Sequence, residues 1–143
     1  RFWLKYSTDI NLNSRNSMEV IDLAFRTGRA AISSDMLILR DSQIQIIREE
    51  LELVSGAIAI HYINGAIENI GDDALRNHEL SEAKAFIMSL PYGENTMVNL
   101  TDANSILSTI GDNFYNVTTV SLIDARAQLA SYLGISSSDA EAL

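Results

Sequence analysis

The feature that most constrains the fold is a long run of apolar residues at helical spacing between residues 41 and 69. Apolar side chains recur there in steps of three and four, which is the spacing of one face of an α-helix. A second apolar stripe follows another side of the same segment, and a helix that is apolar on two sides needs several neighbours to cover it. We therefore expect this segment to be the central helix of a helical bundle.

Four further segments show the same spacing and bring the expected number of helices to four or five. They cover residues 18–32, 73–90, 101–110 and 120–133. We expect Asp72 or Asp73 to cap the N-terminus of one helix, Thr101 to cap another, and Ser121 with Asp124 to form a capping box. The prediction is an all-α fold, an antiparallel bundle over residues 1–134 followed by a polar, frayed tail over residues 135–143.

The helix expected over residues 18–32 is amphipathic. Its predicted core-facing arc contains Met18, Ile21, Ala24, Phe25, Gly28 and Ile32. Asp22 and Arg26 are four residues apart, so we expect them to form an ion pair on the helix surface. Gly28 lacks a side chain and would let a neighbouring helix approach closely.

Composition excludes several classes of function. The 143 residues suit one domain with a single core, and the absence of cysteine excludes thiolate nucleophiles, zinc fingers and iron–sulfur clusters. The net charge is -9 and the ten basic residues are scattered, so nucleic acid is not an expected partner. The sequence has no run of about 18 apolar residues that would predict a transmembrane segment. It also has no glycine-rich phosphate loop and no Gly-x-Ser-x-Gly nucleophile elbow.

Titratable residues at positions where the pattern predicts core are the candidate site. His61 lies on the apolar stripe of the central helix, and His78, Glu79 and Glu82 lie on or beside the predicted inward arc of the next helix. Counting outward from Gly71 at about 1.5 Å per residue places His61 and Glu82 at the same level of an antiparallel pair. Facing helices of bundles build metal sites from such side chains.

The nature of this candidate site stays open between three alternatives. Two histidines with carboxylates and no thiolate would favour iron, manganese or zinc. In the second alternative the same groups are structural, with Arg76 or Arg29 pairing with the carboxylates. Acid–base catalysis is the third, and the sequence offers no nucleophile–base pair that would specify an enzyme. The His78-x-x-x-Glu82 spacing also differs from the His-Glu-x-x-His motif of zinc peptidases.

Three short stretches carry a resemblance to a known group of proteins. They are Arg76-Asn77-His78-Glu79-Leu80-Ser81-Glu82-Ala83 with Phe86-Ile87, Phe25-Arg26-Thr27-Gly28-Arg29-Ala30-Ala31-Ile32, and Ile60-His61-Tyr62-Ile63-Asn64. Together they resemble the C-terminal half of an uncharacterised family of all-helical bacterial envelope lipoproteins that are distantly similar to imelysin. The resemblance extends from Arg1 to about Gly134.

The resemblance implies a two-bundle helical protein of the periplasm or outer-membrane surface, linked to iron uptake, of which this chain would be one half. Imelysin-like proteins carry the motif Gly-x-His-x-x-Glu. Here Arg76 stands at the glycine position, and Glu82 follows His78 by four residues instead of three. This departure puts peptidase activity and a transferred iron site in doubt.

Two functions follow as hypotheses. The first is a non-catalytic envelope protein that binds a metal ion or small ligand in a polar cluster inside the bundle. The second is a structural or interaction module whose buried polar residues serve packing and register. The expected partners are the remaining N-terminal half of the parent chain, another subunit or an envelope transport protein.

The opening Arg1-Phe2-Trp3-Leu4 has no initiator methionine, and we expect the chain to be a piece of a longer protein. Phe2, Trp3 and Tyr6 are spaced like one face of a helical turn. We expect this turn to pack against the bundle or a partner, with Trp3 buried.

Overall fold

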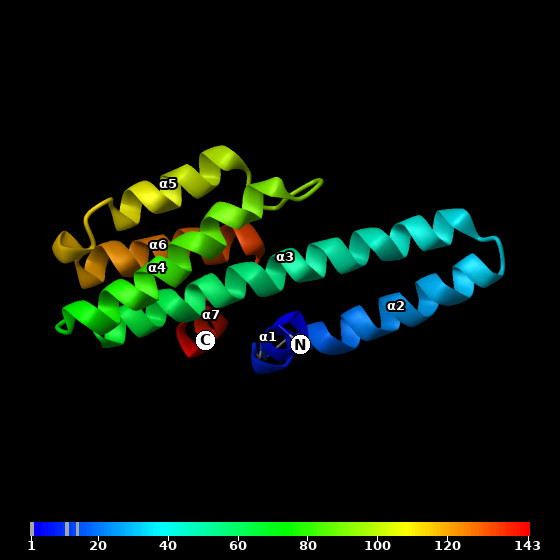
Figure 1. Ribbon diagram of the computed structural model, residues 1–143, viewed down its shortest axis with the longest axis horizontal. Helices are drawn as coiled ribbons and strands as arrows, with labels where there is room; N and C mark the ends of the chain where they lie inside the picture. The colour runs from blue at the N-terminus through cyan, green and yellow to red at the C-terminus, as the bar shows by residue number, and fades with distance from the viewer. Residues whose placement is uncertain (1, 11, 14) are drawn as a thin grey trace. The chain divides into compact units, whose positions relative to one another are not determined.

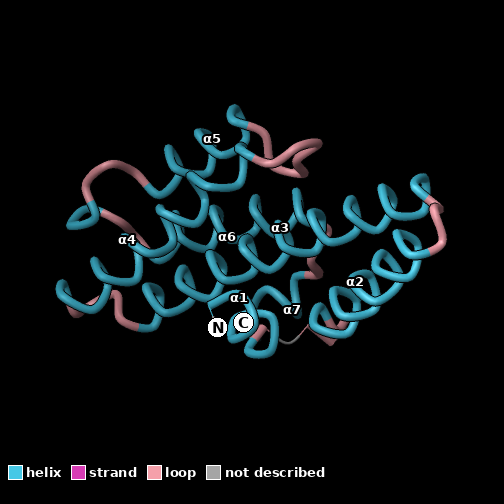
Figure 2. Tube along the Cα trace, turned by 45° about the vertical axis from the view of Figure 1, so that its right-hand side comes forward, coloured by secondary structure: helices cyan, strands magenta, loops and turns pink. Residues whose placement is uncertain are grey.

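The computed structural model describes residues 2–10, 12, 13 and 15–143, with the backbone alone described at residues 2–4 and 9. Within these residues the chain forms helices, short turns and loops, and no strand is present (Figure 1; Figure 2). The prediction of an all-α bundle is confirmed.

Seven α-helices and two short 3-10 helices make up the described structure. The α-helices are α1 (Phe2–Asp9), α2 (Ser17–Ser33), α3 (Leu37–Glu68), α4 (Asp73–Ser89), α5 (Leu100–Ile110), α6 (Thr119–Leu133) and α7 (Ser137–Ala142), and the 3-10 helices are η1 (Leu90–Tyr92) and η2 (Phe114–Asn116). Helices α2 to α6 correspond to the five predicted segments. Helix α3 begins at Leu37 and not near Asp41, because the apolar run of residues 37–39 continues the helix toward its N-terminus.

The chain divides into two compact units, residues 1–54 and 55–143. The first unit contains α1, α2 and the first part of α3. The second contains the rest of α3 and all later helices, including α7 from the predicted tail. Neither unit ends at residue 134.

In the first unit, α1 packs against α2, and α2 runs antiparallel to the beginning of α3 (Figure 1). The Asn16 side chain caps α2 by accepting a hydrogen bond from the backbone N–H of Glu19. Asp35, at a φ of 53°, forms the tight turn into α3. The predicted ion pair between Asp22 and Arg26 is present at 2.8 Å.

The predicted core arc of α2 is only partly correct. Ile21 and Ala24 are buried, but Phe25 and Ile32 are 60% and 58% exposed. The physical reason is that the buried stripe of α2 turns toward Ala31, so the far side of the apolar arc is left uncovered within this unit.

The second unit has a well-packed apolar core. Its largest fully buried apolar side chains are Ile58, Ile60, Ile63, Leu80, Ile87, Val98, Ile106, Leu122 and Leu129. They come from α3, α4, α5, α6 and the loop before α5. Helix α5 packs against both α4 and α6. This unit therefore has the sheltered interior that the sequence pattern predicts for a bundle.

Gly56 sets the spacing between α3 and the end of α6. A Cβ atom at Gly56 would lie 2.2 Å from the Cδ1 atom of Leu133, far inside van der Waals contact. By contrast, a Cβ at Gly28 would lie 3.4 Å from the Cβ of Gln43, an ordinary contact. The close helix approach expected at Gly28 is therefore modest, and the tight one is at Gly56.

The capping residues differ from the predictions at two helices. Asp72 caps α4 as expected, and Gly134 ends α6 in the left-handed conformation. Helix α5, however, is capped by Asn99 and not by Thr101, with Asp102 completing a capping box. Helix α6 begins with a box formed by Thr118 and Ser121. In both cases the cap lies two or three residues upstream, because the backbone turns into the helix earlier than the apolar pattern indicates.

The prediction of a frayed C-terminal tail is wrong. Residues 137–142 form α7, with Ser136 as its N-cap, and Ala140 is buried. At the other end of the chain, α1 confirms a helix in the opening segment, and Tyr6 is half-buried. The predicted burial of Trp3 concerns a side chain that lies outside the described residues.

Candidate binding pocket between α2 and α3

The four residues of the predicted metal site do not form a cluster of ligands. His61 is exposed, and its Nδ1 atom lies 2.5 Å from the backbone carbonyl oxygen of Leu143. His78 is exposed on α4, while Glu79 and Glu82 are half-buried. Among the described residues, no three His, Asp or Glu side chains are grouped so that they could hold a metal ion. Metal binding at these positions stays a prediction without supporting geometry.

The antiparallel arrangement behind that prediction is nevertheless present. A Cβ at Gly65 of α3 would lie 3.0 Å from the carboxylate of Glu79 on α4, so the two helices meet near the level predicted by counting from the turn. The error concerns which faces meet. Helix α4 buries Arg76, Leu80, Ala83 and Ile87, whereas Leu75 is 48% exposed.

Arg76 is a buried polar residue with a structural role. Its guanidinium group donates hydrogen bonds to the carbonyl oxygen of Ile70 at 2.8 Å and to the carboxylate of Asp73 at 2.7 Å. The same group lies 5.9 Å from the ring centroid of Tyr115. Arg76 therefore pairs with Asp73, and not with Glu79 or Glu82 as the structural alternative expected.

A second polar cluster attaches α7 to the helices around it. Asn64 donates a hydrogen bond to the carbonyl oxygen of Ala140 at 2.8 Å and accepts one from Arg126 at 2.9 Å. Arg126 also donates to Glu141 at 3.3 Å. Each polar group of this cluster has a partner that holds the C-terminal helix in place.

An apolar cavity lies within the first unit, between α2 and α3. It has a volume of about 330 Å³. Its lining residues are Ala24, Phe25, Gly28, Arg29, Ile32, Ser33, Arg40, Gln43, Ile44 and Ile47. Helix α2 contributes the first six and α3 the remaining four. Gly28 of α2 faces Gln43 of α3 at this cavity, at an ordinary packing distance.

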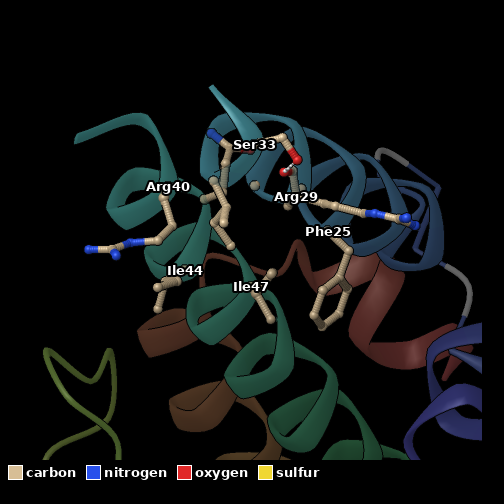
Figure 3. A pocket seen from close by; sticks show the side chains of 10 residues that line it. Phe25, Arg29, Ser33, Arg40, Ile44 and Ile47 are labelled. Atoms are coloured by element: carbon tan, nitrogen blue, oxygen red, sulfur yellow. Dashed lines mark hydrogen bonds between the residues drawn. The ribbon is translucent and has the colours of Figure 1, made fainter. Parts of the chain in front are cut away.

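Large apolar side chains border this pocket and remain open to solvent. Phe25 and Ile32 of α2 are more than half exposed, and Ile44 of α3 is 39% exposed. Figure 3 shows the side chains of Phe25, Ile44 and Ile47 on the same side of the hairpin. Such a contiguous apolar surface is typical of a site that binds another molecule.

Two arginines lie at opposite sides of the pocket. In Figure 3 the guanidinium groups of Arg29 and Arg40 point outward in opposite directions, so that their aliphatic stems line the pocket and their charges lie at its borders. The ten lining residues include no aspartate or glutamate. The pocket is thus an apolar surface with positive charge on both borders, in a protein whose net charge is -9.

The sequence contains the apolar pattern that forms this pocket, but the pattern predicts a core-facing surface there. Four of the six residues of the predicted core arc of α2 line the pocket: Ala24, Phe25, Gly28 and Ile32. Helical periodicity identifies an apolar face but does not say what covers it. Arg29 and Arg40, which lie beside that face, are the further signal in the sequence for a site with positive borders.

No helix of the described residues is long and apolar enough to cross a membrane.

No curated protein and no solved structure matches the chain. A model of one protein family, described as a domain of unknown function (DUF4856), matches residues 1–127. This match covers most of the sequence, and the chain belongs to the DUF4856 family.

Proposed function

We propose that this chain is a non-catalytic interaction module whose α2–α3 pocket binds a helix of a partner protein. One observation carries the proposal: Phe25, Ile32 and Ile44 have the spacing of core residues, yet they are exposed around an apolar pocket. Burial of such side chains is the main source of binding energy at protein interfaces.

The dimensions of the pocket suit a helix. Its lining extends over residues 24–33 of α2, which corresponds to about 14 Å of helix at 1.5 Å per residue. A partner helix of three turns would therefore present one side chain per turn to the pocket. Binding of an amphipathic helix in an apolar groove between two helices is a common mode of peptide recognition.

The arrangement of the polar residues supports a non-catalytic role. Arg76, Asn64 and Arg126 are engaged in hydrogen bonds that hold turns and helices together. Contacts of this kind serve packing and register, although the partner of Arg76 is Asp73 and not Glu79 or Glu82. The ten residues that line the pocket include no nucleophile beside a general base.

The direct test measures binding of a designed peptide of about 18 residues, with leucines at every third or fourth position and glutamine and alanine elsewhere. Fluorescence anisotropy of the labelled peptide would report its affinity. We expect saturable binding to the protein and a loss of roughly tenfold or more in the Phe25→Asp variant, because that change places a charge on the apolar surface.

Leu23→Asp is the matched control. Leu23 is 59% exposed, almost the same as Phe25 at 60%, and it belongs to the same helix but does not line the pocket. This variant should bind the peptide as the unchanged protein does. Absence of binding, or an equal loss in both variants, would contradict the proposed function.

The proposed setting is the bacterial cell envelope. Its support is the resemblance of three stretches of the sequence to imelysin-like envelope lipoproteins, which also suggests a link to iron uptake. Fractionation of cells that produce the full-length protein tests this setting. We expect the protein in the envelope fraction, and recovery with the cytosolic proteins would contradict the proposal.

A further inference from the structure

We infer that the partner helix is acidic, with an apolar stripe flanked on both sides by carboxylates that pair with Arg29 and Arg40. This inference rests on the proposed function and specifies the chemistry of the partner. The two arginines lie at opposite borders of the pocket, so a helix lying in it would bring one flank toward each of them (Figure 3).

Arg29 provides the stronger part of the argument. Its side chain is exposed, and it makes no hydrogen bond or ion pair with the side chains that the structure describes. Arg26, one turn before it, differs because it pairs with Asp22 at 2.8 Å. Arg29 is therefore a cation at the pocket border whose five N–H donors are available to an incoming carboxylate.

Arg40 completes the arrangement on α3. Its Nε and Nη2 atoms contact one oxygen of Asp41 at 2.8 and 2.7 Å. This contact between adjacent residues uses only part of the guanidinium group, which retains further N–H donors. A carboxylate on the second flank of a bound helix can share this arginine with Asp41.

A second copy of this chain fits the pocket less well. A symmetric dimer would pair the same surface patch of both copies. That patch, as lined by the ten residues above, offers arginines but no carboxylate, so Arg29 would meet no opposite charge in it. Charge complementarity favours a different, acidic helix over self-association.

The experiment compares three peptides that share one leucine register and differ only in the residues flanking the stripe: glutamine, glutamate or lysine. We expect the glutamate peptide to bind about two- to fivefold more tightly than the glutamine peptide, and the lysine peptide to bind more weakly, as for exposed ion pairs. The differences should shrink as salt screens the charges.

Two variants assign the charge preference to the pocket border. Arg29→Gln should reduce the glutamate peptide's advantage over the glutamine peptide, whereas Arg26→Gln, which alters a neighbouring arginine outside the pocket, should leave it unchanged. Both residues are exposed, so neither change should affect folding. Circular dichroism spectra and melting temperatures of the two variants check this point.

The possible outcomes separate the inference from the proposed function. Equal binding of all three peptides would overturn the acidic partner while leaving a helix-binding module intact. Failure of all three peptides to bind would remove the proposed function itself. If sedimentation showed that the protein forms dimers that Phe25→Asp dissociates and Leu23→Asp does not, the occupant would be a second copy, and the inference would be overturned.

Discussion

Arg15 and Glu50 form an ion pair in which one partner is fully buried and the other is half exposed. The Nε atom of Arg15 donates to both carboxylate oxygens of Glu50, at 3.0 and 2.8 Å, and its Nη2 atom contacts the same group. The hydrogen bond to Glu50 raises the pKa of Arg15 above its ordinary value. The pair ties the loop before α2 to the middle of α3.

Loss of Arg15 should therefore lower stability markedly. Arg15→Ala leaves the buried carboxylate of Glu50 without its partner, and we expect a loss of about 2–4 kcal/mol in the free energy of unfolding, measured by urea denaturation. Arg26→Ala, which removes the exposed pair with Asp22, should cost less than about 0.5 kcal/mol. Similar losses in the two variants would show that burial of Glu50 contributes nothing.

Two glycine substitutions should have opposite effects. Gly56→Ala forces a Cβ against Leu133, and we expect a net loss of about 1–2 kcal/mol, because overpacking exceeds the gain in helix propensity. Gly28→Ala meets only an ordinary contact and should raise stability by up to about 1 kcal/mol. Thermal melting measures both, and a combination of Gly56→Ala with Leu133→Val should recover part of the loss.

Tyr132 should titrate above the ordinary range for tyrosine. The negative charge of Asp102, together with partial burial and a hydrogen bond to Asp102, raises the pKa of Tyr132 above 10.0. The neutral phenol is the form favoured by folding. Its contribution is therefore fully present below pH 10 and is lost as the pH rises through the higher folded-state value.

Ultraviolet absorbance of the tyrosinate measures this titration. The difference between the unchanged protein and Tyr132→Phe isolates one tyrosine of the five in the chain. Asp102→Asn should move the titration of Tyr132 toward lower pH. A curve that Asp102→Asn leaves in place would show that the carboxylate is not the cause.

Helix α7 should loosen when Asn64 is lost. Asn64→Ala removes the hydrogen bond to Ala140 and leaves Arg126 with Glu141 as its described partner in this cluster. We expect faster amide hydrogen exchange in residues 137–142, with little change in α5. Unchanged protection of α7 would mean that apolar contacts such as that of Ala140 hold the helix by themselves.

Added metal should not stabilise the protein. His61 and His78 are exposed. Among the described residues, neither they nor Glu79 and Glu82 belong to a group of three side chains that could hold a metal ion. We therefore expect the melting temperature to stay the same with and without iron, manganese or zinc, measured before and after treatment with a chelator. A metal-dependent shift that His78→Ala abolishes would support the metal site predicted from the sequence.

The helices could be predicted from the sequence because periodicity is a local property. The segments predicted over residues 18–32 and 120–133 agree with α2 and α6 to within one residue at each end. Helix α7 was missed because its serines and acidic residues resemble a solvated tail. What makes it a helix is a serine cap and the burial of Ala140, and burial depends on a tertiary contact.

The candidate site could be predicted less well, because it depends on which faces meet. A rotation of α4 by part of a turn places Arg76 inside and leaves His78 exposed, which separates the residues of the predicted metal cluster. Likewise, the apolar arc of α2 is visible in the sequence, but its pattern cannot distinguish a face covered by this chain from one left for a partner. At Phe25 the face is left open, and the pocket lies there.

The exposed apolar border at Phe25 and Ile32 also has a consequence for how much of the protein a cell can maintain. A bound helix would stabilise the folded chain, and the gain in free energy of unfolding would grow with the logarithm of the ratio between the free helix concentration and the dissociation constant. Chains made in excess of that helix would keep an exposed apolar surface of the kind that chaperones and proteases recognise. The steady-state amount of this protein would then follow the supply of its partner, and the two would rise and fall together.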